Sequence, residues 1–281
     1  MAEPGRCSAP RANPSALCDS FFGRFAGNQS INQSMSLPRF YISPENKLVD
    51  RILFREQDWN HIRNALRLES GAKVYAFDGH GIQYLVQLDR VDKQGVEGII
   101  LQSEQSKNES PLSITLGQAW LQDSKMSTLV RQVVELGIVA LYPLVTERCQ
   151  VKKKALQESS KAFRWEEIAR QAARQSGRSR VPEIQKKFYS PKEFFAEAES
   201  FDLKLIFWED EKATTLQDIS AKQEIKTASL LFGPEGGWSR EEIETARSHG
   251  YQTISLGPRI LRAETAPLTA ISVLQYIWGD I

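Results

Sequence analysis

The chain has 281 residues, of which 41% are hydrophobic and 25% charged. This composition is typical of globular proteins and excludes a fibrous or disordered chain. The 36 basic and 35 acidic side chains leave a net charge of +1, so overall charge indicates no class of partner. No apolar run approaches the roughly 18 residues that span a bilayer. Three cysteines and three histidines are too few for a disulfide framework or a histidine-rich metal site. We therefore expect a cytoplasmic protein with no metal and no membrane association.

Residues 1–34 differ from the rest of the chain. They are rich in Ala, Ser, Asn, Gly and Pro and have no apolar periodicity. A strand pattern begins only after Met35, so we expect Met35 to be the functional start. The preceding segment is then a disordered leader or an over-called start.

Short strand patterns predict a small β-barrel over residues 35–110. Strands are expected near residues 37–42, 74–77, 82–88 and 96–101, with a turn at Asp78-Gly79 and one short helix over residues 58–66. The polar stretch 102–110, which ends before Pro111, is the expected domain linker.

From residue 111 to the C-terminus strands alternate with helices, which predicts a parallel sheet covered on both faces. Strands are expected at 112–119, 138–145, 203–208, 228–232 and 252–256. Helices are expected at 125–136, with apolar residues at i, i+3, i+4 spacing, and at 156–176. Two more follow: one opens with the capping box at Ser239, and the last has Pro267 in its first turn.

A local excess of positive charge lies within residues 147–187, which hold twelve basic and five acidic side chains. Such a cluster attracts phosphates and steers polyanions. Most charge runs are nonetheless ordinary solvated helix faces, so this feature alone leaves nucleic-acid binding open.

Two glycine-containing loops carry the strongest chemical signal. Residues 231–238 join a strand to a capped helix and hold three glycines and one proline, whereas an ordinary turn needs at most one glycine. Residues 255–267 form a second, long loop with Ile260 and Leu261 beside two arginines and Glu264. Neither loop has the spacing of a phosphate-binding loop or a dinucleotide fingerprint. Together they predict a small-molecule site at the carboxyl ends of parallel strands.

The same two segments resemble the signatures of a known family. Residues 231–239 are similar to its Gly-Pro-Glu-Gly-Gly signature and residues 256–266 to its Leu-Gly-x-x-Ile-Leu-Arg-x-Glu-Thr-Ala signature. The family is that of the 16S ribosomal RNA uridine-N3 methyltransferases (ribosomal RNA small subunit methyltransferase E), a branch of the SPOUT methyltransferases. Segments at 66–68, 78–79, 135–137, 146–148 and 164–178 match further family segments in the same order.

The resemblance covers essentially residue 37 to the C-terminus and implies an α/β fold. A PUA-like, RNA-binding β-barrel at 35–110 would precede a SPOUT domain at 111–281 with a deep trefoil knot. It also implies a homodimer that methylates N3 of a specific uridine in 16S rRNA, on the assembled small ribosomal subunit, with S-adenosyl-L-methionine as donor.

Site residues follow from the same resemblance. Arg262 would stabilise the uracil anion, and Glu264 would orient the base or accept its proton; for Glu264, pairing with a helix dipole is an equal alternative. Arginines expected to face RNA are Arg39, Arg67, Arg148, Arg164, Arg174 and Arg178. Residues expected at the donor are Leu231, Gly233, Pro234, Glu235, Gly236, Leu256, Gly257, Ile260, Leu261, Thr265 and Ala266.

Two rival functions remain open at this point. A SPOUT enzyme acting on a ribose 2′-hydroxyl or on guanine would have similar loops. A non-catalytic RNA-binding protein would use the basic segment alone, although it would need no donor pocket.

Overall fold

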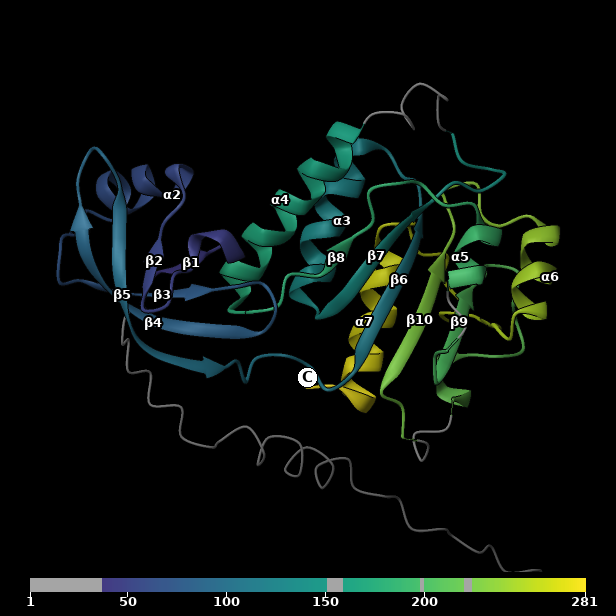
Figure 1. The fold of residues 1–281 in the computed structure, drawn as a ribbon. Helices are drawn as coiled ribbons and strands as arrows, with labels where there is room; N and C mark the ends of the chain where they lie inside the picture. Colours follow the sequence, from purple (N-terminus) through teal and green to yellow (C-terminus); the bar gives the residue numbers. More distant parts are fainter. Residues whose placement is uncertain (1–36, 151–158, 198–199, 220–223) are drawn as a thin grey trace, which may run out of the picture. The chain divides into compact units, whose positions relative to one another are not determined.

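A computed structural model describes residues 37–281, apart from residues 151–158, 198–199 and 220–223 (Figure 1). The expected leader, residues 1–34, and the lysines Lys152, Lys153 and Lys154 of the basic segment lie outside the described residues.

The first sheet has the strand order β1-β3-β4-β5-β2. Its strands are β1 (Arg39–Tyr41), β2 (Arg51–Leu53), β3 (Lys73–Phe77), β4 (Ile82–Val91) and β5 (Val96–Gln105). The sheet curls around a core of its own that includes Phe40, Ile52, Val74 and Val86. Helix α2 (Glu56–Asn60) and a π-helical turn (His61–Ala65) stand where the short helix was expected. This curled sheet confirms the PUA-like expectation.

One boundary in this region was wrong. Residues 102–105 were assigned to the linker, but they continue β5 and pair with the first half of β4. Their side chains are polar and exposed, so they carry no apolar alternation. The backbone hydrogen bonds that pair two strands do not depend on side-chain polarity.

The second sheet is parallel throughout and has the order β11-β9-β10-β6-β7-β8. Its strands are β6 (Ser113–Ala119), β7 (Ile138–Leu144), β8 (Glu183–Ile184), β9 (Leu203–Phe207), β10 (Thr227–Phe232) and β11 (Gln252–Ile254). The order places β9 between β10 and β11. The loops that follow β10 and β11 therefore flank the carboxyl end of β9.

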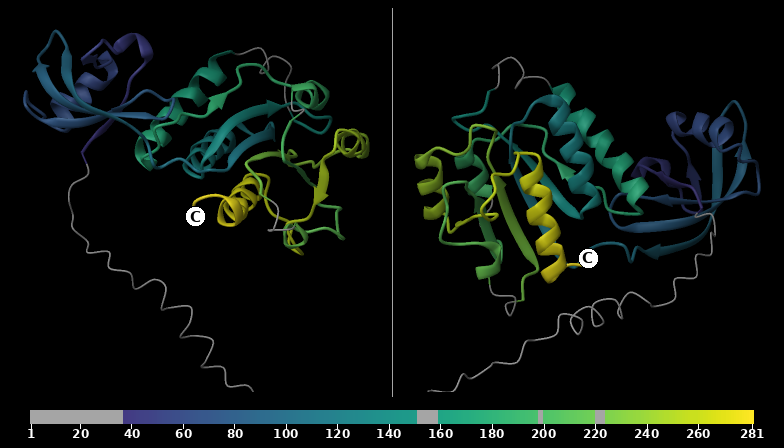
Figure 2. Two further views of the ribbon diagram at one scale, coloured as in Figure 1. Left: turned by 60° about the horizontal axis from the view of Figure 1, so that its bottom comes forward. Right: turned by 180° about the vertical axis from the view of Figure 1, so that it is seen from behind.

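Helices cover both faces of this sheet, as expected. The α3 (Asp123–Glu135), α4 (Ser159–Ser176) and α7 (Thr265–Trp278) helices share a core with one face. Figure 2 shows α7 in front of the strands when the molecule is seen from behind. The α5 (Pro191–Glu197) and α6 (Arg240–Ser248) helices share a core with the other face. Successive residues of β10 alternate between the two cores: Leu230 and Phe232 join the first, and Leu231 joins the second.

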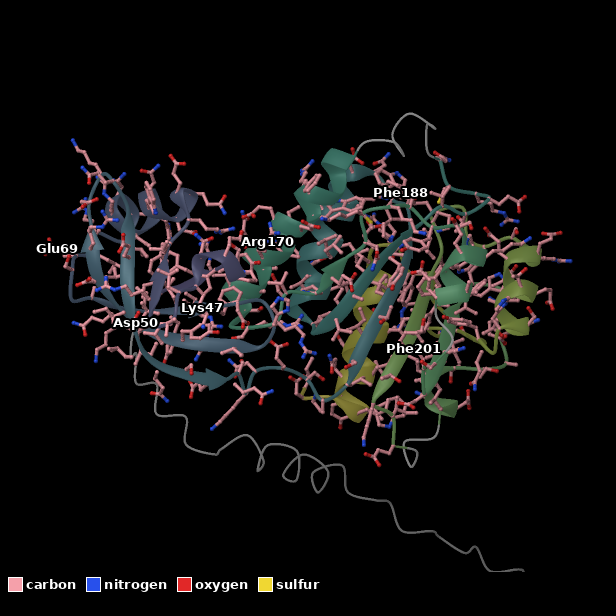
Figure 3. All side chains as sticks on the ribbon, in the orientation of Figure 1. Lys47, Asp50, Glu69, Arg170, Phe188 and Phe201 are labelled. Carbon is pink, nitrogen blue, oxygen red and sulfur yellow. The ribbon has the colours of Figure 1, made fainter. Side chains whose placement is uncertain are left out.

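An aromatic cluster forms part of the first core. The ring of Phe188, labelled in Figure 3, lies 5.2 Å from that of Trp120 and 6.2 Å from that of Trp165, between ring centroids. Both tryptophans are almost completely buried. The cluster anchors α4 to the residue that follows β6.

Candidate functional site

A cavity of about 430 Å³ lies at the carboxyl ends of β9, β10 and β11. The last residues of these strands, Phe207, Phe232 and Ile254, form part of its wall. Its volume lies within the range typical of small-molecule sites. Both glycine-containing loops line it, which confirms that they share one site.

The first loop, residues 233–237, turns tightly before α6. Pro234 O accepts a hydrogen bond from Gly237 N at 3.0 Å, and Gly237 has a φ of +70° that disfavours any side chain. Trp238 Nε1 donates to Phe207 O at 3.1 Å, which ties the loop to β9. The capping box of Ser239 and Glu242 then starts α6, as the sequence indicates.

The second loop, residues 255–264, runs from β11 to α7. Ser255 N donates to Thr214 O at 2.8 Å, and Gly257 has a φ of +98°. At the other end Arg262 O accepts hydrogen bonds from Thr265 N and Ala266 N, so the first turn of α7 closes without a side-chain cap. Ile260 is 89% exposed at this cavity, an unusual position for a large apolar side chain.

Part of the cavity wall is apolar. The Phe207 and Phe232 rings are stacked, with centroids 4.4 Å apart and an interplanar angle of 4°. Leu256, Leu261 and Ala266 add further apolar wall. Charged side chains, among them Lys125, Glu235 and Arg262, line the same cavity, and a mainly apolar wall with a few polar groups is typical of small-molecule sites.

Opposite charges meet on the wall of the same cavity. Lys125 Nζ lies 3.0 Å from Glu235 Oε1 and 3.6 Å from Glu264 Oε2. The hydrogen bond to Glu235 is the main cause that raises the pKa of Lys125. The guanidinium of Arg262, an exposed residue of the same wall, makes no ion pair among the described residues.

Glu264 has an unusual environment. It occupies the N-cap position of α7, yet its carboxylate makes no capping hydrogen bond. Its Oε2 atom is buried and has no hydrogen-bond partner among the described residues. A carboxylate that served chiefly to cap the helix would accept from the free N–H groups of the first turn. Glu264 therefore contributes no capping hydrogen bond to α7.

Most residues expected at the donor line the cavity, but three do not. Leu231 points to the opposite core, because side chains alternate along β10. Gly236 lies against Arg148, whose carbonyl oxygen would be 3.2 Å from an added β-carbon. Thr265 is exposed at the start of α7. The expected residues that do line the cavity are Gly233, Pro234, Glu235, Leu256, Gly257, Ile260, Leu261 and Ala266.

The sequence interpretation missed the residues that come from other segments. Lys125 lies near the start of α3, and Trp208, Glu209 and Lys212 follow β9. No local motif marks them. Only the strand order, in which β9 lies between β10 and β11, would have identified the three residues after β9 as part of the cavity wall.

Two of the arginines expected to face RNA have structural roles instead. Arg178 is only 4% exposed. Its guanidinium donates to the Glu109 carboxylate and to the carbonyl oxygens of Val134 and Ile138. Arg39 is half-buried, and its guanidinium bonds Gln83, Ser179 Oγ and the Arg178 carbonyl oxygen. The expectation of an RNA contact is wrong for Arg178, because its guanidinium is occupied within the protein.

The other expected RNA-facing arginines are accessible. Arg67, Arg148 and Arg164 are exposed, and Arg174 is half-buried. Arg170, labelled on α4 in Figure 3, is paired with Glu166 and Glu167. The basic segment is therefore partly neutralised by its own acidic residues.

Two further properties concern only the part of the chain that the structure describes. No helix there has the length and apolar character needed to cross a membrane. No group of three or more His, Cys, Asp or Glu side chains there is placed to hold a metal ion.

Comparison with known proteins defines the class. Residues 108–275 match the family model of an RNA methyltransferase domain, and residues 54–101 match that of an RNA methyltransferase PUA domain. These two matches, together with the curled sheet, the parallel sheet and the cavity at its carboxyl edge, identify the chain as a SPOUT-type RNA methyltransferase. The chain belongs to the ribosomal RNA small subunit methyltransferase E family.

Individual relatives agree over nearly their full length. Ribosomal RNA small subunit methyltransferase E of Buchnera aphidicola (subsp. Schizaphis graminum) is 32% identical over 87% of this chain and 98% of its own. The Neisseria gonorrhoeae enzyme of that name, solved with bound S-adenosyl methionine, is 36% identical with a TM-score of 0.78. A putative methyltransferase of Legionella pneumophila, solved with bound S-adenosylmethionine, is 34% identical with the same TM-score. Both structures align with 87% of this chain and 99% of theirs.

Proposed function

We propose that this protein transfers the methyl group of S-adenosyl-L-methionine to N3 of a uridine in 16S ribosomal RNA. The observation that carries this proposal is the meeting of both signature loops in one cavity, with Arg262 and Glu264 on its wall. The cavity fits the donor: the apolar side chains of Leu256, Leu261 and Ala266 would face the adenine, and the carboxylates of Glu235 and Glu264 stand on the same wall as the site of the cationic sulfonium.

The donor supplies an activated methyl group on a sulfonium sulfur, so the chain's residues mainly orient and stabilise. The imide N3 of uracil must lose its proton to become a nucleophile. Arg262 stabilises the negative charge that then spreads over the uracil oxygens. Glu264 receives the N3 proton, directly or through water. Its buried Oε2, which accepts no hydrogen bond among the described residues and lies 3.6 Å from the Lys125 ammonium, is the acceptor for that proton.

RNA would bind over the exposed arginines Arg67, Arg148 and Arg164 and the half-buried Arg174. Contacts of this kind hold the backbone phosphates and fix register without reading sequence. We infer a division of labour in which residues 35–110 help to bind RNA and residues 111–281 carry out the transfer. The match of separate family models to these two regions supports this division.

We also infer a cytoplasmic homodimer that acts on the assembled small ribosomal subunit. Tyr276 on α7 is 76% exposed and Ile260 at the cavity is 89% exposed. A second copy of the chain that covered them would remove this apolar surface from water.

The test is to incubate the protein with S-adenosyl-L-methionine carrying a deuterated methyl group and either free 16S rRNA or assembled small subunits. We expect labelled 3-methyluridine, identified by nucleoside mass analysis, from the subunits and not from the free RNA. Label on a ribose or on guanine would favour the first rival function. RNA binding without any label would favour the second, a non-catalytic binder.

A further inference from the structure

Lys125 joins three segments that are distant in the sequence. It lies in the first turn of α3, and its ammonium contacts Glu235 in the first loop and Glu264 at the end of the second. The distances are 3.0 Å to Glu235 Oε1 and 3.6 Å to Glu264 Oε2. The two donor-binding loops are therefore linked through one cation supplied by a third element.

Glu264 depends on this cation for its placement. Its carboxylate has neither a capping hydrogen bond to α7 nor any hydrogen bond to Oε2 among the described residues. The Lys125 ammonium makes the one ion pair that the described residues offer to Glu264. Without that contact, no ion pair and no hydrogen bond to Oε2 among the described residues would hold the carboxylate in place.

We propose that Lys125 is a positioning residue for methyl transfer, which holds the Glu264 carboxylate aimed at the uracil while Glu235 anchors the lysine to the first loop. This inference rests on the proposed function, because it needs a substrate proton that Glu264 accepts. Lys125 acts through Glu264 and not on the donor's methyl group. Its removal should therefore slow turnover more than it weakens binding.

The position of Lys125 allows this role to be separated from a structural one. The Lys125 side chain is 34% exposed and that of Glu235 is 44% exposed, and ion pairs this accessible to water contribute little to folding stability. We therefore expect the melting temperature of Lys125→Ala to stay close to that of the wild type. A purely structural role would lower it together with activity.

The experiment is a double-mutant cycle on the full chain, with Lys125→Ala, Glu264→Gln and the double variant. Turnover on small subunits gives kcat and KM, and calorimetry gives the Kd for S-adenosyl-L-methionine. We expect Lys125→Ala to lower kcat by about 10- to 100-fold, less than the loss of a full acid–base group. We expect KM and Kd to change by less than about threefold, because binding contacts stay in place. In the Glu264→Gln background the same change should lower kcat by less than about twofold, because the coupled partner is already gone.

Two further variants complete the design. Lys125→Arg keeps the charge and should restore most of the lost kcat. Lys192→Ala removes an exposed lysine of α5 that does not line the cavity, and it should behave as wild type. If Lys125→Ala unfolds, Lys125→Gln takes its place in the cycle.

Unchanged kcat in Lys125→Ala would overturn the proposal, and so would the same loss of kcat with and without Glu264. A wild-type protein that binds the donor but makes no 3-methyluridine would instead overturn the proposed function. The two failures are therefore distinguishable.

Discussion

Arg262 carries the electrostatic part of the proposed reaction. Its guanidinium has no ion-pair partner among the described residues, so it is free to meet the charge that forms on the uracil oxygens. Charge stabilisation of this kind is a large contribution to catalysis.

Replacing Arg262 by Ala should lower kcat by about 100- to 1000-fold, a loss typical of a removed transition-state donor. The Kd for S-adenosyl-L-methionine should stay within about threefold of the wild type, because the loop backbone that holds the donor is unchanged. Single-turnover methylation and calorimetry measure the two quantities. Near-normal turnover would remove Arg262 from the mechanism.

Arg67 has a backbone conformation that arginine rarely adopts. Its φ is +51°, the one positive value for a non-glycine residue in the described chain. Such a conformation costs about 1 kcal/mol per residue for an L-amino acid. Strain of this kind at an exposed side chain is often associated with function.

Arg67→Gly should therefore have opposite effects on stability and on binding. The free energy of unfolding should rise, by up to about 1 kcal/mol, because glycine accepts a positive φ. RNA affinity should fall, and the slope of log K against log salt should decrease by about 1 if Arg67 contacts one phosphate. Urea unfolding and binding titrations at several salt concentrations measure both. An unchanged salt slope would exclude the phosphate contact.

At the scale of single elements, the reliable signals were local periodicity and end residues. The apolar spacing over residues 125–136 predicted the buried face of α3, and Met126, Leu129 and Val133 are fully buried there. Gly137 and Gly177, which lie just beyond the ends of α3 and α4, have φ values of +91° and +81° that favour glycine. Neither the two-residue β8 nor the seven-residue α5 was predicted. Elements this short do not repeat a pattern often enough to be recognised.

Glu211 fixes the segment that follows β9 to β11. Its carboxylate accepts from Thr253 Oγ1 at 2.6 Å and from Ala213 N at 2.8 Å. These hydrogen bonds, that from Thr253 first, lower the pKa of Glu211. A carboxyl whose pKa is lowered by folding stabilises the fold above its unfolded pKa, and that stabilisation is lost as the pH falls through its folded value.

Glu211→Gln should accordingly lower the free energy of unfolding at pH 7 by about 1 kcal/mol. The glutamine oxygen can still accept these hydrogen bonds, but without the negative charge they are weaker. The difference between wild type and variant should shrink as the pH falls from about 5 to 3, around the ordinary glutamate pKa. Urea unfolding across this range is the measurement. A difference that does not depend on pH would contradict the assigned ionised state.

At the scale of the whole molecule, long-range pairing decided what the sequence could not. Arg178 belongs to a basic segment and was expected at the surface, yet it pairs with Glu109, 69 positions away. Glu109 Oε1 also accepts from the N–H groups of Ser179 and Arg180. Composition identifies a charge but not its partner, so a buried ion pair is indistinguishable from a solvated arginine in the sequence.

In the site, too, local patterns could be recognised in the sequence, whereas the contacts between distant segments could not. The two loops could be found from their glycines and from a family resemblance, and both line the cavity. That the segment after β9 lies between them follows from the strand order β11-β9-β10. Strand order depends on how the chain threads through the sheet, which no local pattern encodes.

The central claim is that the two loops form one binding site for the methyl donor, and a matched pair of glycine variants tests it most directly. Gly257 and Gly250 have φ values of +98° and +83°, and neither has an atom within 4 Å of an added β-carbon. Valine therefore introduces similar backbone strain at both positions, but only Gly257 lines the cavity.

Calorimetric titration of S-adenosyl-L-methionine into wild type, Gly257→Val and Gly250→Val is the measurement. We expect Gly257→Val to weaken donor binding by at least about 10-fold, since a β-branched side chain would enter the space of the ligand. Gly250→Val should bind as the wild type does. Wild-type affinity in a folded Gly257→Val would contradict the shared donor site and the proposed methyl transfer with it.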